Sequence, residues 1–351
     1  MVRRALLLFL FLLAPLASAA TRLIAYVDKD TDIPRMSAEK LTHVNYAFAS
    51  IDDDGDVVLQ TVDLQRLRQL RELRTRNANL KILLSIGGAR ARHFRESAAT
   101  AASRRRFAES AAALVRGNAL DGVDVDWEYP ERREERRNFP LLLAELRRVL
   151  GPRRLLTIAS SGGESLDTNM IGELHPYLDW INLMGYDMAG AWTPRTGHSS
   201  ALYWNPAAGD DGPSVYAFVK QYLAAGVPPA KLVLGVPFDA HVFTGVRRQR
   251  HGFNQPYEEV GRSIPWYQIG ALKGFVRYWD DVAAVPYLWN ERTATFISYD
   301  DPQSLHEKVR FVRKERLGGM MYWLQRHDPD EQLLDVLVRR LRESERTATA
   351  P

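Results

Sequence analysis

The sequence contains no cysteine among its 351 residues. This absence excludes disulfide bonds, thiolate nucleophiles, thiolate metal ligands and redox control through cysteine. Histidine is scarce as well: the eight histidines are scattered, and none forms the H-E-x-x-H spacing of a zinc site. The sequence therefore predicts no metal and no cofactor. Its 46% of hydrophobic residues must supply a core that is stable without cross-links.

A large excess of one charge is also missing. The chain has 47 lysines and arginines against 43 aspartates and glutamates, which gives a formal charge of +4. Without Arg3 and Arg4, 45 basic residues face 43 acidic ones, a charge of about +2. This balance predicts no nucleic-acid partner. The densest charge run, Glu131 to Arg137, alternates arginine with glutamate and favours a solvent-exposed helix with i,i+4 pairs over a phosphate-binding patch.

The N-terminal apolar run is too short to cross a membrane. It extends from Ala5 to Leu13 and is followed by Pro15, whereas a spanning helix needs about 20 apolar residues. Arg3 and Arg4 precede the run and small residues follow it up to Ala19, which is typical of a secretory signal peptide at residues 1–19. Cleavage is favoured over an uncleaved membrane anchor. We therefore expect a secreted or periplasmic monomer that has no contact with the membrane once the signal is removed.

Eight short runs of apolar and β-branched residues alternate with amphipathic segments. They lie at Leu23–Val27, Thr42–Phe48, Leu80–Ile86, Gly122–Asp126, Leu155–Ala159, Trp180–Met184, Leu232–Val236 and Gly319–Leu324. Strands that alternate with helices predict a parallel sheet, and eight of them favour the α/β class with a closed (β/α)8 TIM barrel. An open Rossmann-like sheet is disfavoured because no glycine-rich phosphate loop follows the first run.

The longest interval between two predicted strands precedes the last one. It extends from Phe238 to about Phe296 and is rich in aromatic residues. Long segments inside a compact domain are usually structured or functional, so we predict a small α+β insertion at about residues 239–295, between strands 7 and 8. The catalytic barrel then covers residues 20–343, and residues 344–351 form a polar tail.

Three carboxylates recur at every second position near the middle of the chain. In the segment Asp121-Gly-Val-Asp124-Val-Asp126-Trp-Glu128-Tyr-Pro130, period two predicts a strand with Asp124, Asp126 and Glu128 facing into the barrel. Burial of like charges raises the pKa of at least one of them, which provides a proton donor near neutral pH. Glu128, nearest the carboxyl end of the strand, is the predicted acid. A divalent-cation site is disfavoured because such loops use glycine-rich turns, and a solvated edge strand does not explain three inward acids.

The segment Asp121–Glu128 resembles the signature of glycoside hydrolase family 18, the chitinases and their relatives. Further matches follow in order at Tyr46–Phe48, Ser85–Gly88, Met184–Asp187 and Gly318–Trp323. The stretches Lys231–Phe238 and Phe296–Asp301, with Ser304 and Lys308, are also similar to the family. The predicted insertion resembles the chitinase insertion domain of this family.

The resemblance implies retaining cleavage of β-1,4-linked N-acetylglucosamine, in which the 2-acetamido group of the substrate acts as the nucleophile. Glu128 would be the acid and base, Asp126 would stabilise an oxazolinium intermediate, and Asp124 would share a proton with Asp126. Tyr186 and Asp187 would close the acetamide pocket. Substrate contacts would come from Trp323 and Met321 beneath the sugar, and from Met184, Tyr26, Ser85, Phe48 and Trp192.

Other residues of the motifs are predicted to be structural. Asp121 lies an odd number of positions from Asp124, so its side chain would point to the other face of the strand from the inward acids. It would orient the start of the strand. Gly87 and Gly88 would shape the turn after the third strand, with Ser85 hydrogen-bonding the carboxylates from beneath.

The sequence departs from the family near the expected cleft. Arg90 and Arg92 follow Gly88 where many relatives have tryptophan, and Asp239-Ala240 replaces the usual Tyr-Gly. The added positive charge favours anionic glycans, so an endo-β-N-acetylglucosaminidase acting on N-glycans or peptidoglycan is the alternative to a chitinase. A non-catalytic chitin lectin is disfavoured because Glu128 is intact.

Overall fold

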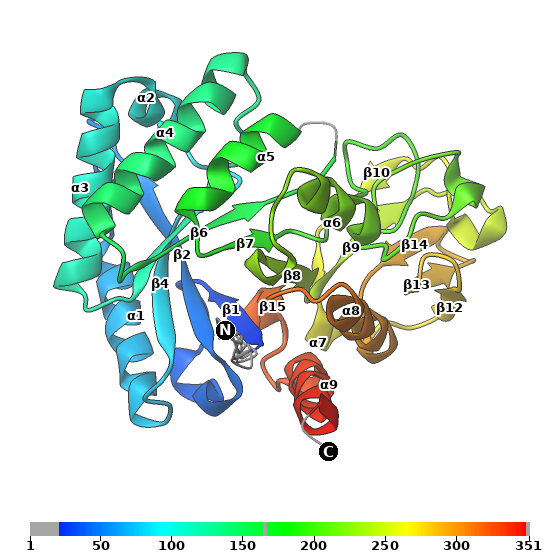
Figure 1. Ribbon diagram of the computed structural model, residues 1–351. Coiled ribbons are helices and arrows are strands. Elements are labelled where there is room, and N and C mark those ends of the chain that lie inside the picture. Colours follow the sequence, from blue (N-terminus) through cyan, green and yellow to red (C-terminus); the bar gives the residue numbers. More distant parts are fainter. Residues whose placement is uncertain (1–20, 164–166, 349–351) are drawn as a thin grey trace, which may run out of the picture.

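The computed structural model describes residues 21–163 and 167–348. The predicted signal peptide, residues 1–19, lies outside the described residues. Two bodies lie side by side: a barrel of parallel strands surrounded by helices, and a smaller antiparallel sheet beside it (Figure 1). None of the helices in the described ranges is long and apolar enough to cross a membrane.

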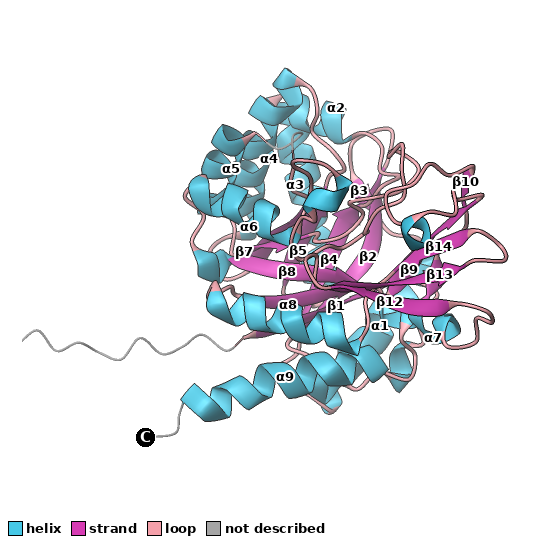
Figure 2. Cartoon of the chain, turned by 90° about the vertical axis from the view of Figure 1, so that its right-hand side faces the viewer, coloured by secondary structure: helices cyan, strands magenta, loops and turns pink. Residues whose placement is uncertain are grey.

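Eight parallel strands form the closed barrel (Figure 2). Strand β1 pairs with both β2 and β15, which closes the sheet and confirms the predicted (β/α)8 fold. All eight predicted strands are present. They are β1 (Arg22–Val27), β2 (His43–Ile51), β4 (Lys81–Gly87), β5 (Gly122–Asp126), β6 (Leu155–Ser160), β7 (Trp180–Leu183), β8 (Leu232–Pro237) and β15 (Gly319–Trp323). A short strand, β3 (Val57–Val58), pairs with the end of β2.

Amphipathic helices surround the barrel. They are α1 (Thr61–Glu72), α2 (Phe94–Ala99), α3 (Ala101–Gly117), α4 (Arg133–Leu150), α5 (Thr168–Leu174), α6 (Val215–Ala224), α8 (Pro302–Lys314) and α9 (Gln332–Ala348). In α4, the residues Phe139, Leu142, Leu143 and Leu146 follow helical spacing, and all four are buried against the strands. The helix ends at Gly151, whose φ of 72° is a conformation that glycine adopts without strain.

Two expectations about helices can be compared with the structure. Helix α9 continues to Ala348, so the first part of the predicted polar tail at 344–351 is helical, since no proline or glycine interrupts it. Helix α4 begins only at Arg133, so Glu131 and Arg132 precede it. The ion pairs of the charge run join Arg132 to Glu135 and Arg95 to Glu134 and Glu135, and none of those found in the described residues has the predicted i,i+4 spacing.

The predicted insertion between β8 and β15 is a six-stranded antiparallel sheet. Its strands are β9 (Asp239–Thr244), β10 (Glu259–Val260), β11 (Ile264–Pro265), β12 (Val276–Asp280), β13 (Val285–Asn290) and β14 (Thr295–Ser298), with the short helix α7 (Trp266–Ile269). Phe243, Trp289 and Phe296 are fully or almost fully buried in its aromatic core. The sheet begins at the predicted residue 239 and ends three residues beyond 295, at Ser298.

Candidate active site

Strand β5 places its acidic side chains inside the barrel, as its period-two pattern predicts. Asp124 and Asp126 are buried among the inward-facing residues, whereas Val123, Val125 and Trp127 belong to the core between strands and helices. Trp127 stacks on Phe94 with ring centroids 5.2 Å apart. The strand ends at Asp126, as the predicted run does, so Glu128 lies just beyond its carboxyl end. Catalytic residues of TIM barrels occupy this end of the strands.

Asp124 is fully buried and accepts four hydrogen bonds. Oδ2 accepts from the Tyr26 hydroxyl and the Ser85 hydroxyl, both at 2.8 Å. Oδ1 accepts from the Thr157 hydroxyl at 2.5 Å and the Asn182 amide at 3.0 Å. Burial raises the pKa of Asp124, and the four donors oppose that increase. The predicted contact from Ser85 is confirmed.

Asp126 and Glu128 lie close enough to interact electrostatically. Burial, followed by the charges of Glu128 and Asp124, raises the pKa of Asp126 well above its usual range. Burial also raises the pKa of Glu128, and the nearby charge of Asp187 adds to this effect. Asp126 Oδ1 is buried and has no hydrogen-bond partner among the described residues. Among the described residues, Asp124 accepts from four other donors and no hydrogen bond joins it to Asp126, so the shared proton that the family resemblance implies stays a prediction.

A cleft of about 320 Å³ opens above these acids. Most of the predicted site residues line it: Tyr26, Phe48, Gly87, Gly88, Asp126, Glu128, Met184, Tyr186, Asp187 and Trp323. Phe48 stacks on Trp323 with ring centroids 5.7 Å apart, which forms an apolar surface on one side. Burial raises the pKa of the Tyr186 phenol well above its usual range, so the phenol stays protonated as a hydrogen-bond donor. The cleft therefore combines an apolar surface with the three carboxyl groups of Asp126, Glu128 and Asp187 and with the Tyr186 hydroxyl as a donor.

Only glycine fits the turn after β4. Gly87 has a φ of 128°, and a Cβ atom there would lie 1.9 Å from the Asp126 carbonyl oxygen. At Gly88 the φ is 86°, and a Cβ atom would meet the Phe48 ring at 2.6 Å. Both glycines thus allow the backbone to approach the carboxylate strand closely, which supports their predicted structural role.

Three predicted substrate contacts lie outside the cleft. Met321 is fully buried inside the barrel, so it supports Trp323 from below and does not line the cleft as expected. Ser85 is fully buried against Asp124. Trp192 is 64% exposed beyond the wall of the cleft, where its edge faces the His241 ring at 6.3 Å. Its predicted role in substrate binding stays a prediction.

Asp121 lies at the opposite end of β5 from the cleft. Its Oδ2 accepts a hydrogen bond from the Ile82 backbone N–H at 2.8 Å. The same oxygen forms an ion pair with the Arg74 guanidinium group at 2.5 Å. These contacts tie the start of β5 to β4 and to the helix before it. These contacts support the predicted structural role of Asp121.

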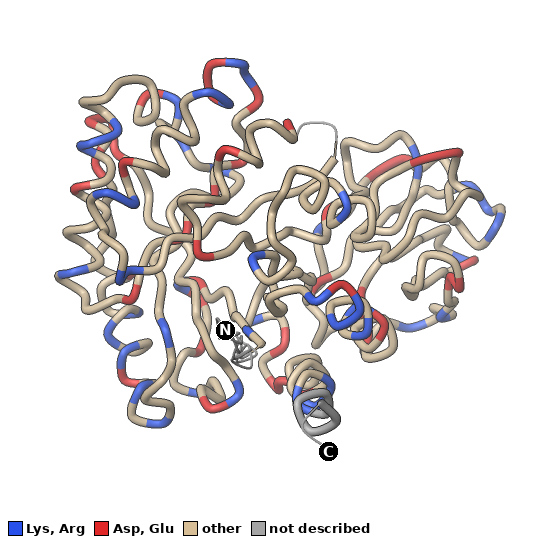
Figure 3. Tube along the Cα trace, viewed as in Figure 1, with Lys and Arg blue, Asp and Glu red and all other residues tan. Residues whose placement is uncertain are grey.

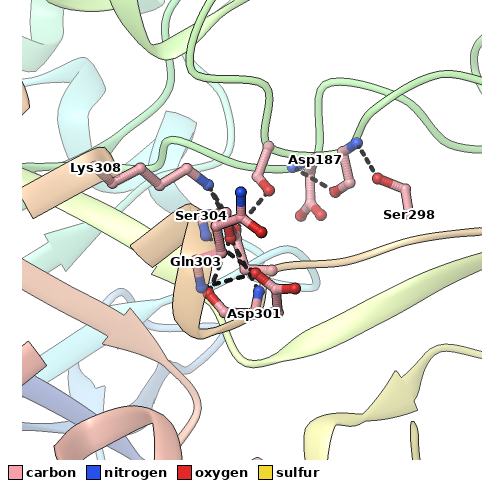
Figure 4. A network of polar contacts seen from close by, with 9 residues as sticks. Asp187, Ser298, Asp301, Gln303, Ser304 and Lys308 are labelled. Atoms are coloured by element: carbon pink, nitrogen blue, oxygen red, sulfur yellow. Dashed lines mark hydrogen bonds and ion pairs between the residues drawn. The ribbon is translucent and has the colours of Figure 1, made fainter. Parts of the chain in front are cut away.

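A polar network holds the loop that carries Asp187 (Figure 4). The Asp187 N–H donates to Ser199 Oγ at 3.3 Å, and the Ser199 N–H donates to Ser298 Oγ at 2.7 Å. The Ser200 hydroxyl donates to Asp300 Oδ2 at 2.6 Å. Asp300 also pairs with Lys308 at 2.6 Å, with both side chains fully buried. Ser298 therefore ties the loop to β14, and the family-like residues Ser304 and Lys308, which do not line the cleft, tie it to α8 through Asp300.

Sequence reasoning missed Thr157, Asn182 and His241. Asn182 was recognisable as a polar residue in an otherwise apolar predicted strand, and Thr157 is similarly placed in β6. His241 on β9 pairs with Asp187, with 2.9 Å between Nε2 and Oδ1. Burial lowers the pKa of His241, but the hydrogen bond and charge of Asp187 outweigh this effect and raise it overall. In the part of the chain that the structure describes, no group of three His, Cys, Asp or Glu side chains is suited to hold a metal ion.

Comparisons with known proteins agree with this geometry. The sequence model of glycosyl hydrolases family 18 matches residues 22–328. Chitinase A1 of Niallia circulans is 37% identical over 293 residues, which cover 73% of this chain and 42% of that protein. This chain thus spans less than half of that relative's length. Endochitinase 1 of Metarhizium robertsii is 33% identical over 328 residues, which cover 83% of this chain and 76% of that protein.

The fold is similar to solved structures over nearly its whole length. A family 18 N-acetylglucosaminidase from Paenibacillus barengoltzii has a TM-score of 0.85 and 36% sequence identity, and the match covers 91% of this chain and 99% of that chain.

Proposed function

This chain belongs to glycosyl hydrolases family 18 and is a glycosidase, and we propose that it cleaves β-1,4-linked N-acetylglucosamine in chitin or chito-oligosaccharides with retention of configuration. The names of its relatives, chitinase and endochitinase, support this substrate class. The observation that carries the proposal is a single cleft in which Glu128, Asp126, Tyr186 and Trp323 converge.

In the proposed reaction, Glu128 donates its proton to the glycosidic oxygen as the bond to the anomeric carbon breaks. The carbonyl oxygen of the 2-acetamido group on the same sugar attacks the anomeric carbon and forms an oxazolinium ion. Glu128, now ionised, removes a proton from a water molecule. The water attacks the anomeric carbon and opens the oxazolinium ring, while the sugar ring stays intact. The raised pKa of Glu128 supports the first step, since the carboxyl group must be protonated to act as the acid.

Asp126 and Tyr186 align the acetamide nucleophile in this proposal. The buried Asp126 Oδ1 has no hydrogen-bond partner within the described ranges and is suited to accept the acetamide N–H, which increases the negative charge on the acetamide oxygen. The protonated Tyr186 hydroxyl donates to that oxygen and holds it near the anomeric carbon. Asp124, saturated with hydrogen bonds, positions the strand and does not contact the substrate.

Retention of configuration tests the proposal directly. When chitotetraose is hydrolysed, proton NMR at early times should show the β-anomer as the first product, before mutarotation. A cellotetraose control lacks the acetamide group and should not be cleaved, because it has no internal nucleophile. Initial release of the α-anomer, or equal cleavage of cellotetraose, would contradict the mechanism.

We also propose that the protein is exported through an N-terminal signal peptide. The basic, apolar and small-residue segments that precede Ala20 support this proposal. N-terminal sequencing of the protein recovered outside the cytoplasm should begin at Ala20. Recovery of an intact N-terminus from a membrane fraction would show an uncleaved anchor instead.

A further inference from the structure

Five arginines line a groove of about 900 Å³ at the N-terminal end of α4. They are Arg95, Arg132, Arg133, Arg136 and Arg137, and we call this surface the arginine groove. Figure 3 shows basic and acidic positions crowded at this end of the helix. All but Arg136 are exposed, and Arg136 is half-buried. None of these arginines takes part in the reaction proposed for the cleft.

The arginine groove and the catalytic cleft are built on neighbouring segments of the chain. Arg90 in the loop after β4 lines the cleft, and Arg95, five residues further in α2, lines the groove. In the loop after β5, Glu128 and Arg132 are four residues apart, so their Cα atoms are separated by no more than about 14 Å. A sugar chain that occupies both the cleft and the groove would follow the loop between Glu128 and Arg132.

The positive charge of the groove is only partly neutralised. Arg95 and Arg132 have carboxylate oxygens of Glu134 or Glu135 at 3.8–3.9 Å. Arg133, Arg136 and Arg137 form no ion pair with the carboxylates of the described residues. The five arginines face three lining carboxylates, Glu134, Asp167 and Glu173, and the buried Glu135 that pairs with Arg95 and Arg132, which leaves a formal excess of one positive charge.

A neutral polymer of N-acetylglucosamine carries no formal charge, so it gains no charge–charge attraction from these arginines. Complementary charge accelerates the encounter with an anionic ligand and selects for it, and the planar guanidinium group matches a carboxylate with two parallel hydrogen bonds. The three carboxylates within the groove repel a doubly charged phosphate more strongly than a singly charged carboxylate. The groove therefore fits a glycan that carries isolated carboxyl groups.

We propose that the arginine groove selects N-acetylglucosamine glycans in which a sugar beyond those held in the cleft bears a carboxylate. This inference rests on the proposed function, because the bond is still broken in the cleft by Glu128 and the substrate acetamide. The groove adds affinity for the acidic part of the chain outside the cleft.

The test compares two substrates of equal length: a chito-oligosaccharide and its partly O-carboxymethylated form, with every acetamide group intact. At low salt the protein should cleave the acidic form with a kcat/KM about 10-fold higher, and high salt should remove the difference by screening. The double substitution Arg133→Gln and Arg137→Gln should reduce this preference about 5-fold and leave the neutral substrate unaffected. The matched control is Arg313→Gln with Arg339→Gln, which removes two exposed arginines from α8 and α9 and should retain the preference.

A binding measurement separates failure of this inference from failure of the proposed function. If the protein cleaves neither oligosaccharide, the proposed function is wrong, and calorimetry with the Glu128→Gln protein still tests the groove. Tighter, salt-sensitive binding of the acidic oligosaccharide that is lost on adding Arg133→Gln and Arg137→Gln supports the groove. Equal binding of both oligosaccharides, or a preference that survives the two substitutions, overturns it.

Discussion

Substitution of Glu128 by glutamine is expected to lower kcat on chitotetraose by at least about 100-fold, the usual contribution of general acid catalysis. Glutamine keeps the shape of the side chain but cannot deliver a proton to the leaving oxygen. The KM should change much less, because Glu128 lines the cleft without forming its apolar floor. Steady-state kinetics on the purified variant measure both parameters.

The pH dependence distinguishes a catalytic role of Glu128 from a structural one. Burial raises the pKa of Glu128 above its ordinary 4.5, so the proton is retained to a higher pH and kcat/KM should fall as the pH rises through the raised value. The residual activity of Glu128→Gln should lack this alkaline limb. Glu131→Gln, on an exposed glutamate three residues further, is the control and should behave like the wild-type protein. An unchanged kcat in Glu128→Gln would remove Glu128 from the mechanism.

Substitution of Asp126 by asparagine is expected to lower kcat by about 100-fold and, at the same time, to leave the folded protein at least as stable. The activity falls because a neutral amide cannot stabilise the positive oxazolinium ion. The stability is preserved because Asp126 is buried beside Glu128 and Asp124, whose charges raise its pKa, and an uncharged side chain avoids that repulsion.

Thermal unfolding and kinetics on the same Asp126→Asn preparation measure the two effects. Asp53→Asn is the control, since the Asp53 side chain is fully exposed and both quantities should stay at the wild-type values. A fall in activity that is accompanied by a lower Tm would indicate that Asp126 supports the fold, and it would contradict the proposed electrostatic role.

The pattern of strand β5 made the centre of the site predictable from the sequence. Alternation of acids with Val123, Val125 and Trp127 assigns one set to the barrel interior and the other to the helices, and the structure agrees. The same parity argument fails for Met321 and Trp323. Both face inward from β15, but only Trp323 reaches the cleft. The sequence could not predict this difference, because alternation assigns a face of the strand and not a depth along the barrel axis.

Contacts between distant segments were not predictable. Thr157 and Asn182 meet Asp124 because closure of the barrel brings strands β5, β6 and β7 together around one interior. His241 reaches Asp187 from the insertion, 54 positions further along the chain. The arginines of the groove come from α2 and from the start of α4, and 37 positions separate Arg95 from Arg132.

The sequence by itself determined the class of fold, the order of the strands and the identity of the acids, because these depend on local periodicity and on residue types with distinctive chemistry. The tertiary structure decided which carboxyl oxygen lacks a partner, which aromatic residues reach the cleft and which charges face the same groove. Those properties depend on distances between segments far apart in the chain, and such distances are fixed only when the barrel closes and the insertion packs against it.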